Sequence, residues 1–246
     1  MFPANLESHH RMSHKNLQKV FDLPELRNRV HVFRDRAAAG KALAEMMKAY
    51  RKSDAMVLGI PAGGVAVASV LAKELQLPLD VAVVSKITPS WNSEVGYGAV
   101  AFDGTVILNE ELLSRFHLSQ DEIQKGIKKT EEKVARRLKR LRGDQPLPDL
   151  NQGIILVDDG LASGFTLRVA IEALQKSGSR HLIVAVPTAH EESIDRVIEE
   201  VDAVYCPNIR GGWQFAVADA YERWRDLDEE EVKKILAEFN ADSKKD

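Results

Sequence analysis

The chain has 246 residues, of which 44% are hydrophobic and 29% charged, and its formal net charge is −3. This composition excludes a mainly disordered chain, a collagen-like fibre and, because Cys206 is the single cysteine, a disulfide scaffold. The near-neutral charge balance gives no global attraction to nucleic acid or to anionic lipid.

No apolar run approaches the ~18 residues that a membrane helix needs, and the polar N-terminus lacks the apolar stretch of a signal peptide. A lone cysteine fits a reducing compartment, so we expect a cytoplasmic protein with no membrane partner. Three histidines near the N-terminus, His9, His10 and His14, are interpreted as a polar tail rather than a metal site. We expect residues 1–30 to extend a domain that spans residues 31–246.

The first third of the chain alternates between helices and short apolar strands. Apolar residues at three- and four-residue spacing predict helices, and short apolar runs predict strands. The predicted helices cover residues 35–52 and 65–76, and the predicted strands cover residues 56–60 and 80–84. Pro61 and the Gly63–Gly64 pair separate a strand from the helix after it. This alternation is typical of parallel βαβ units.

The middle of the chain interrupts this alternation. Residues 86–97 predict a long loop, and Asp103–Gly104 predicts the turn of a hairpin between strands 99–102 and 105–108. A long helix is predicted over 119–142, with a capping box of Ser119 and Glu122. It carries nine basic and four acidic residues. This composition fits either a surface that binds phosphate or nucleic acid, or an ordinary solvated helix face. The acidic residues are interleaved with the basic ones, which favours the solvated face. We expect residues 110–145 to form a helical insertion.

Strands and helices alternate again in the last third of the chain. Strands are predicted over 154–157, 181–186 and 203–206, helices over 166–176, 191–200 and 228–239, and an irregular segment over 208–220. The pattern predicts one α/β domain whose sheet is mostly parallel and covered by helices on both faces. The segment from about 207 to 225 is predicted to form a C-terminal hood.

The strongest local signal runs from Ile154 to Leu167. Four apolar residues predict a buried strand, Asp158 and Asp159 follow it, and a turn of small residues leads into a helix. Ligands bind at the carboxyl ends of strands in open parallel sheets, and helix N-termini favour phosphate. Two carboxylates would repel a phosphate but would accept hydrogen bonds from sugar hydroxyls. The segment therefore indicates a ribose 5-phosphate site, with an ordinary capped turn as the alternative.

Other motifs fit less well. The run Gly96–Ala101 matches a dinucleotide fingerprint, but it follows a loop and enters a β-rich segment, and a P-loop motif is absent from the sequence. A hydrolase nucleophile elbow at Ser163 would need glycine at the positions of Leu161 and Phe165. No set of His, Cys, Asp and Glu has the spacing of a metal site.

The segment 154–167 resembles the phosphoribosyl-pyrophosphate (PRPP) motif of type I phosphoribosyltransferases. The motif's loop corresponds to Ala162, Ser163, Gly164, Phe165 and Thr166. Further segments are similar, in the same order, to a little-characterised subgroup of that family: Pro61–Val65, Pro78–Asp80, Val83–Ile87 and Gly98–Val100. The resemblance covers residues 31–235 and implies a type I phosphoribosyltransferase-like fold.

The resemblance also implies roles for individual residues. Asp158 and Asp159 would hold the ribose hydroxyls, residues 162–166 the 5-phosphate, and Lys86 would act at the catalytic centre. The pyrophosphate would be bound by Ala62, Gly63, Gly64 and Arg36, with Mg²⁺ that arrives with PRPP and is held in part by Asp158 or Asp159. Ala62 and Ser85 stand where the subgroup commonly has arginine. Arg36, Lys86 or the partner subunit of a homo-oligomer would then supply the missing positive charge.

The reaction that the resemblance implies is transfer of a phosphoribosyl group from PRPP to a nitrogen base or amine, in nucleotide metabolism. The alternatives are a PRPP- or nucleotide-sensing protein without turnover and a phosphosugar enzyme of another reaction type. His190 either contacts substrate or begins a helix, and Cys206 is interpreted as a small buried residue. Trp213, Phe215 and Tyr221 either form a hood that stacks on a base or pack the C-terminal helix.

Overall fold

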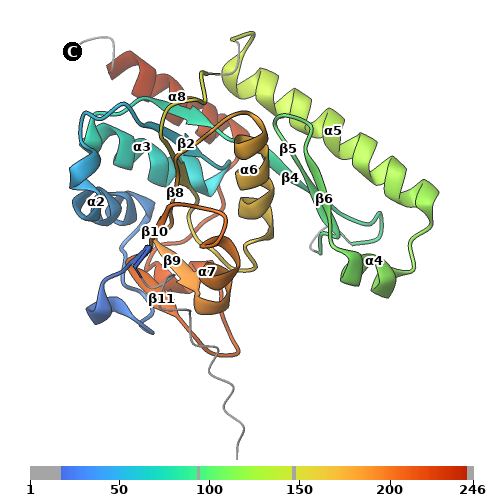
Figure 1. The fold of residues 1–246 in the computed structure, drawn as a ribbon, viewed down its shortest axis with the longest axis horizontal. Helices are drawn as coiled ribbons and strands as arrows, with labels where there is room; N and C mark the ends of the chain where they lie inside the picture. The colour runs from blue at the N-terminus through green and yellow to red at the C-terminus, as the bar shows by residue number, and fades with distance from the viewer. Residues whose placement is uncertain (1–17, 93–94, 146–147, 243–246) are drawn as a thin grey trace, which may run out of the picture.

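The computed structural model describes residues 18–92, 95–145 and 148–242, and a six-stranded parallel sheet forms its centre (Figure 1). Every neighbouring pair in this sheet is parallel, which confirms the predicted fold class. In spatial order the strands are β1 (Val20–Phe21), β10 (Ala203–Tyr205), β8 (Leu182–Ala185), β7 (Ile154–Val157), β2 (Met56–Gly59) and β3 (Leu79–Val81). The histidines of the N-terminal tail lie outside the described residues.

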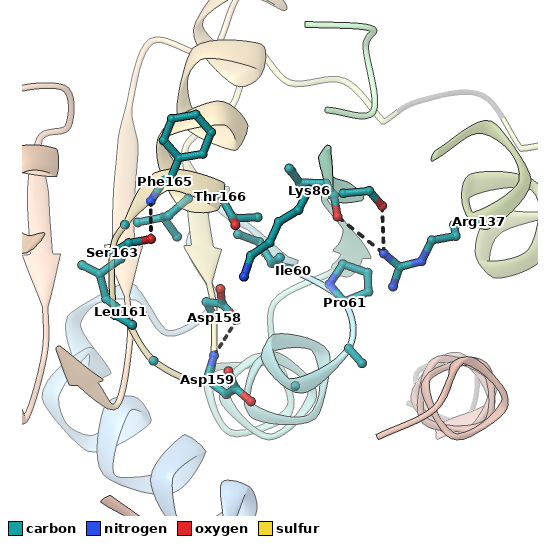
Figure 2. Close-up of a pocket in the computed structure, with 18 of the residues that line it drawn as sticks. Ile60, Pro61, Lys86, Arg137, Asp158, Asp159, Leu161, Ser163, Phe165 and Thr166 are labelled. Atoms are coloured by element: carbon teal, nitrogen blue, oxygen red, sulfur yellow. Dashed lines mark hydrogen bonds between the residues drawn. The ribbon is translucent and has the colours of Figure 1, made fainter. Parts of the chain in front are cut away.

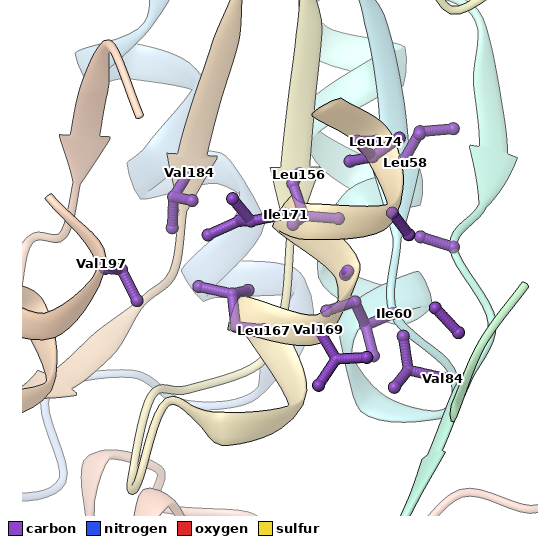
Figure 3. Close-up of a cluster of buried hydrophobic side chains, with 14 of the residues drawn as sticks. Leu58, Ile60, Val84, Leu156, Leu167, Val169, Ile171, Leu174, Val184 and Val197 are labelled. Atoms are coloured by element: carbon purple, nitrogen blue, oxygen red, sulfur yellow. The ribbon is translucent and has the colours of Figure 1, made fainter. Parts of the chain in front are cut away.

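Helices cover both faces of the sheet, and its central strands are therefore buried on both sides. Alternate residues of β7 enter different cores: Ile155 faces α2 and α3, whereas Leu156 faces α6. Figure 3 shows Leu156 and Val184 packed against Leu167 and Ile171 of α6. The helices are α2 (Arg36–Met46), α3 (Gly63–Leu75), α6 (Phe165–Lys176), α7 (Glu191–Val197) and α8 (Glu229–Asp242).

A separate antiparallel sheet occupies the middle of the chain and lies between α6 and a long helix, α5 (Figure 1). The predicted hairpin is confirmed, with Val100 opposite Val106. Helix α5 begins after Ser119, and the capping box with Glu122 is present. The elements are β4 (Val84–Ile87), β5 (Gly98–Ala101), β6 (Val106–Leu108), α4 (Glu110–Phe116) and α5 (Gln120–Arg142).

Three sequence predictions need correction. The run 80–84 is not one strand, because β3 pairs with β2 whereas β4 pairs with β5 in the other sheet. The predicted loop 86–97 accordingly begins later, since Lys86 and Ile87 belong to β4. The segment 208–220 is not wholly irregular: β11 (Asn208–Arg210) pairs with β9 (Thr188–His190), and Thr188 donates a 2.7 Å hydrogen bond to Asn208 in the buried interior. Strands of three residues carry too little alternation to be recognised from sequence.

Three smaller features complete the fold. Residues 18–30, part of the expected N-terminal extension, include the edge strand β1 beside β10. Short 3-10 helices lie at Pro24–Leu26, Lys48–Tyr50 and Val217–Ala220. In the described part of the chain, no helix combines the length and apolar character that crossing a membrane requires.

Candidate functional site

A cavity of about 500 Å³ opens where β2 and β7 end, and β4 runs along it (Figure 2). Its lining brings together residues that are far apart in the sequence. Those predicted as site residues are Ala62, Gly63, Lys86, Asp158, Asp159, Ala162, Ser163, Gly164, Phe165 and Thr166. Gly64 and Arg36 are not part of the lining. The carboxyl edge of the parallel sheet therefore carries the pocket, as expected for this class of fold.

The two aspartates at the end of β7 have different surroundings. The backbone N–H of Asp159 donates a 2.8 Å hydrogen bond to Oδ1 of Asp158. Asp159 forms an ion pair with Arg36, with 2.8 Å between Nη2 and Oδ2. Burial, and then the neighbouring carboxylate of Asp159, raises the pKa of Asp158 well above its ordinary value. The surroundings therefore disfavour the charge of Asp158, whereas Asp159 has a cationic partner.

We expect Asp158→Asn to stabilise the free protein increasingly as pH rises. The folded state raises the pKa of Asp158, so the carboxyl contributes its full stability below its unfolded pKa, about 3.9, and that contribution is lost as pH rises through the folded pKa. Asparagine does not titrate. Urea unfolding of both proteins between pH 4 and 8 should show a widening difference in the free energy of unfolding. A difference that is constant with pH would contradict this assignment.

Arg36 lies behind Asp159 rather than in the cavity wall. Its guanidinium is 4.0 Å from the ring centroid of Trp224, and Nη1 donates a 2.8 Å hydrogen bond to the carbonyl of Arg225. The hydroxyl of Tyr221 donates a 2.6 Å hydrogen bond to the carbonyl of Asp159. The segment after the 3-10 helix at 217–220 thus holds both Arg36 and Asp159 in place.

The loop 162–166 leads into α6, and side chains of α7 hold two of its backbone carbonyl groups. Gly164 has φ +74°, a left-handed conformation that favours glycine. Ser193 of α7 donates a hydrogen bond to the carbonyl of Ala162, and Arg196 donates one of 3.3 Å to the carbonyl of Ser163. The first N–H groups of a helix lack intrahelical partners, so the loop presents an anion-binding surface to the cavity.

The opposite side of the cavity is formed by the start of α3 and by β4. The Pro61–Ala62 peptide bond is cis, and Gly63 follows as the first residue of α3. A Cβ atom at Gly63 would collide with the carboxylate of Asp159. Figure 2 shows the Lys86 side chain extending from β4 across the cavity towards Asp158. This side therefore offers backbone groups and one flexible cation.

Two basic lining residues were missed by the sequence prediction. Lys133 and Arg137, one helical turn apart on α5, also line the cavity. Other basic residues of α5 are paired on its exposed surface, as Lys125 is with Asp121 and Arg136 with Glu132. The basic composition of this helix was the available signal, but it does not show which of its cations face the cavity.

The aromatic residues of the expected hood are dispersed. Tyr221 is buried against Phe33, Phe215 lies edge-on against His190, and Trp213 is fully exposed. Nε2 of His190 is 3.0 Å from the carbonyl of Gly212. Neither side chain of the His190–Phe215 pair is among the residues that line the cavity.

The side chains outside the cavity show two further features. Cys206 is buried, and burial raises the pKa of its thiol. Within the residues that the structure describes, no group of three or more His, Cys, Asp or Glu is placed to hold a metal ion.

Comparisons with known proteins match most of the chain to one family. The family model of the phosphoribosyl transferase domain matches residues 34–220. A Mycobacterium tuberculosis protein named "Putative phosphoribosyl transferase Rv0571c", and its counterpart MT0597 in a second strain, are 32% identical over 212 residues. These matches cover 86% of this chain and 48% of the relatives, so the chain spans about half the length of the curated relatives it matches.

A solved structure is similar over most of this chain. TT1426 from Thermus thermophilus is 31% identical and superposes with a TM-score of 0.66. The similarity covers 84% of this chain and 98% of that one.

Proposed function

The chain belongs to the phosphoribosyl transferase domain family, and from this membership and the cavity we propose that it transfers the phosphoribosyl group of PRPP to a nitrogen base or amine. The observation that carries the proposal is the convergence of three segments on one cavity. They are the aspartates after β7, the loop that begins α6, and the turn between β2 and α3. Each segment suits a different part of PRPP.

The loop 162–166 would bind the 5-phosphate through backbone N–H groups and the hydroxyls of Ser163 and Thr166. Asp158 and Asp159 would accept hydrogen bonds from the ribose hydroxyls. Arg36 supports this role because it fixes the carboxylate of Asp159 from the side away from the cavity lining. Lys86, Ala62 and Gly63 would face the pyrophosphate.

The transfer needs no covalent nucleophile from the protein. A lone pair on the acceptor nitrogen forms the new bond to C1 of the ribose, and the C1–O bond breaks with its electron pair leaving on pyrophosphate. The acceptor nitrogen then loses its proton to solvent. The negative charge of the aspartates would stabilise the positive charge that develops on the ribose, and the cavity would hold the reactants in line.

Magnesium suits the oxygen donors of this cavity. Mg²⁺ prefers phosphate and carboxylate oxygens and water, and carboxylates lie beside the expected phosphate positions. We propose that PRPP phosphate oxygens and Asp158 or Asp159 would hold it. The ion would neutralise charge on the leaving pyrophosphate.

The first test is calorimetric titration with PRPP in the presence of MgCl₂. We expect saturable binding that is tighter than that of ribose 5-phosphate, because the pyrophosphate adds contacts. Absence of PRPP binding by the folded protein would contradict the proposal.

The second test is exchange of labelled pyrophosphate into PRPP with a panel of purine and pyrimidine bases and their monophosphates. Exchange with one base identifies the acceptor. Saturable PRPP binding without exchange on any acceptor would instead identify a PRPP-sensing protein without turnover, the alternative that the replacements at Ala62 and Ser85 favour.

A further inference from the structure

Three basic side chains line the cavity. Lys86 comes from β4, and Lys133 and Arg137 come from α5 in the helical insertion. In Figure 2 the Ser163–Phe165 loop and Arg137 lie on opposite sides, with Asp158 and Lys86 between them. The cavity is therefore asymmetric, because one side offers mainly backbone N–H groups and the other offers side-chain cations.

Arg137 is held in a defined orientation. Its Nε donates a 2.6 Å hydrogen bond to Oε1 of Glu229, the first residue of α8. Its Nη1 lies 3.3 Å from the hydroxyl of Ser85 and 3.5 Å from the carbonyl of Val84. The side chain is only 14% exposed. These contacts involve Nε and Nη1, so the fork of the guanidinium can still donate from Nη2.

Apart from Lys86, the positive charge beside β4 and the α3 turn comes from another element, α5. Ala62 and Ser85, from the α3 turn and β4, are uncharged. Arg137 reaches Ser85 from a different element, α5, and Lys133, one turn earlier, is exposed to solvent. A diphosphate carries more negative charge than a monophosphate. The side with the two cations of α5, which Lys86 can reach from the middle of the cavity, therefore suits the diphosphate, and the loop with backbone amides suits the monophosphate.

We infer that Lys133 and Arg137 of α5 bind the pyrophosphate group of PRPP together with Lys86. This inference rests on the proposed function and adds two residues to its site. The helical insertion then supplies the positive charge on the pyrophosphate side, where Ala62 and Ser85 supply none.

The test compares PRPP with ribose 5-phosphate, which lacks the pyrophosphate. Calorimetry would measure both ligands with the wild type, Lys133→Gln and Arg137→Gln. Each substitution should weaken PRPP binding about tenfold or more and change the affinity for ribose 5-phosphate by less than about twofold, because only PRPP reaches α5. Arg136→Gln is the matched control, since Arg136 lies on the same helix, is exposed and pairs with Glu132.

The outcomes separate this inference from the proposed function. If the wild type binds no PRPP, the proposed function fails. If the wild type binds PRPP and both variants bind it equally well, or if the variants lose both ligands alike, only the assignment of Lys133 and Arg137 is wrong. Lys133 is exposed, so Lys133→Gln removes charge without a buried contact, and thermal melting checks the fold of Arg137→Gln.

Discussion

Replacing both aspartates, Asp158→Asn with Asp159→Asn, should weaken PRPP binding about a hundredfold or more. Both side chains line the cavity at the end of β7, and each would lose a charge-assisted hydrogen bond to a ribose hydroxyl. The variant should stay folded, because a neutral amide at residue 158 suits a position where burial, and then the carboxylate of Asp159, raise the pKa of Asp158. Calorimetry measures the affinity, and circular dichroism confirms the fold.

A matched control for this variant removes two negative charges at a position outside the cavity. Glu110 and Glu111 are adjacent and exposed at the start of α4, outside the cavity. The double substitution of both by Gln should leave PRPP affinity within about twofold, since exposed charges at a distance are screened by salt. Unaltered PRPP binding by the folded aspartate variant would remove these residues from the site.

Gly64→Ala should destabilise the protein by about 1–3 kcal/mol, the usual effect of overpacking in a tight interior. A Cβ atom at Gly64 would lie 2.7 Å from the carbonyl oxygen of Val157 and 2.8 Å from Cα of Asp158. Both atoms belong to backbone, so α3 must move away from the end of β7. We expect PRPP binding to fall as well, because Asp158 moves with that backbone.

Chemical denaturation of Gly64→Ala and of Gly153→Ala checks this expectation. A Cβ atom at Gly153 would meet its nearest neighbour, Cβ of Ala55, at 3.7 Å, an ordinary contact. Gly153→Ala should therefore change the free energy of unfolding by about 0.5 kcal/mol or less. Equal stability of the two variants would show that α3 accommodates the extra methyl group. The family resemblance implied a pyrophosphate contact for Gly64, and in the structure this residue packs closely against the end of β7.

The geometry also divides the predicted site into residues that face the cavity and residues that support them. Arg36 was expected to bind pyrophosphate, and its guanidinium instead contacts Asp159, Trp224 and the carbonyl of Arg225. Its position favours a role in holding Asp159. Arg137, absent from the predicted site, lines the cavity.

Local sequence was sufficient wherever a feature depends on neighbouring residues. The strand Ile154–Val157 agrees residue for residue with its prediction, and the turn and helix after it follow within one residue. The Ser119 capping box and the Asp103–Gly104 turn are local as well, because three or fewer residues separate the groups that form them. The fold class followed from the alternation of such local units.

Tertiary structure alone decided the pairings across long separations. Arg36 and Asp159 are 123 residues apart, and Arg137 and Glu229 are 92 apart. The short strands β9 and β11 likewise become recognisable only when they lie side by side. Sequence periodicity shows which face of an element is apolar, but the element that covers that face depends on how the chain folds back. The alternation of strands and helices therefore determined the α/β fold, and the resemblance of residues 154–167 to a known motif indicated the phosphoribosyltransferase family, whereas packing decided which cations reach the cavity.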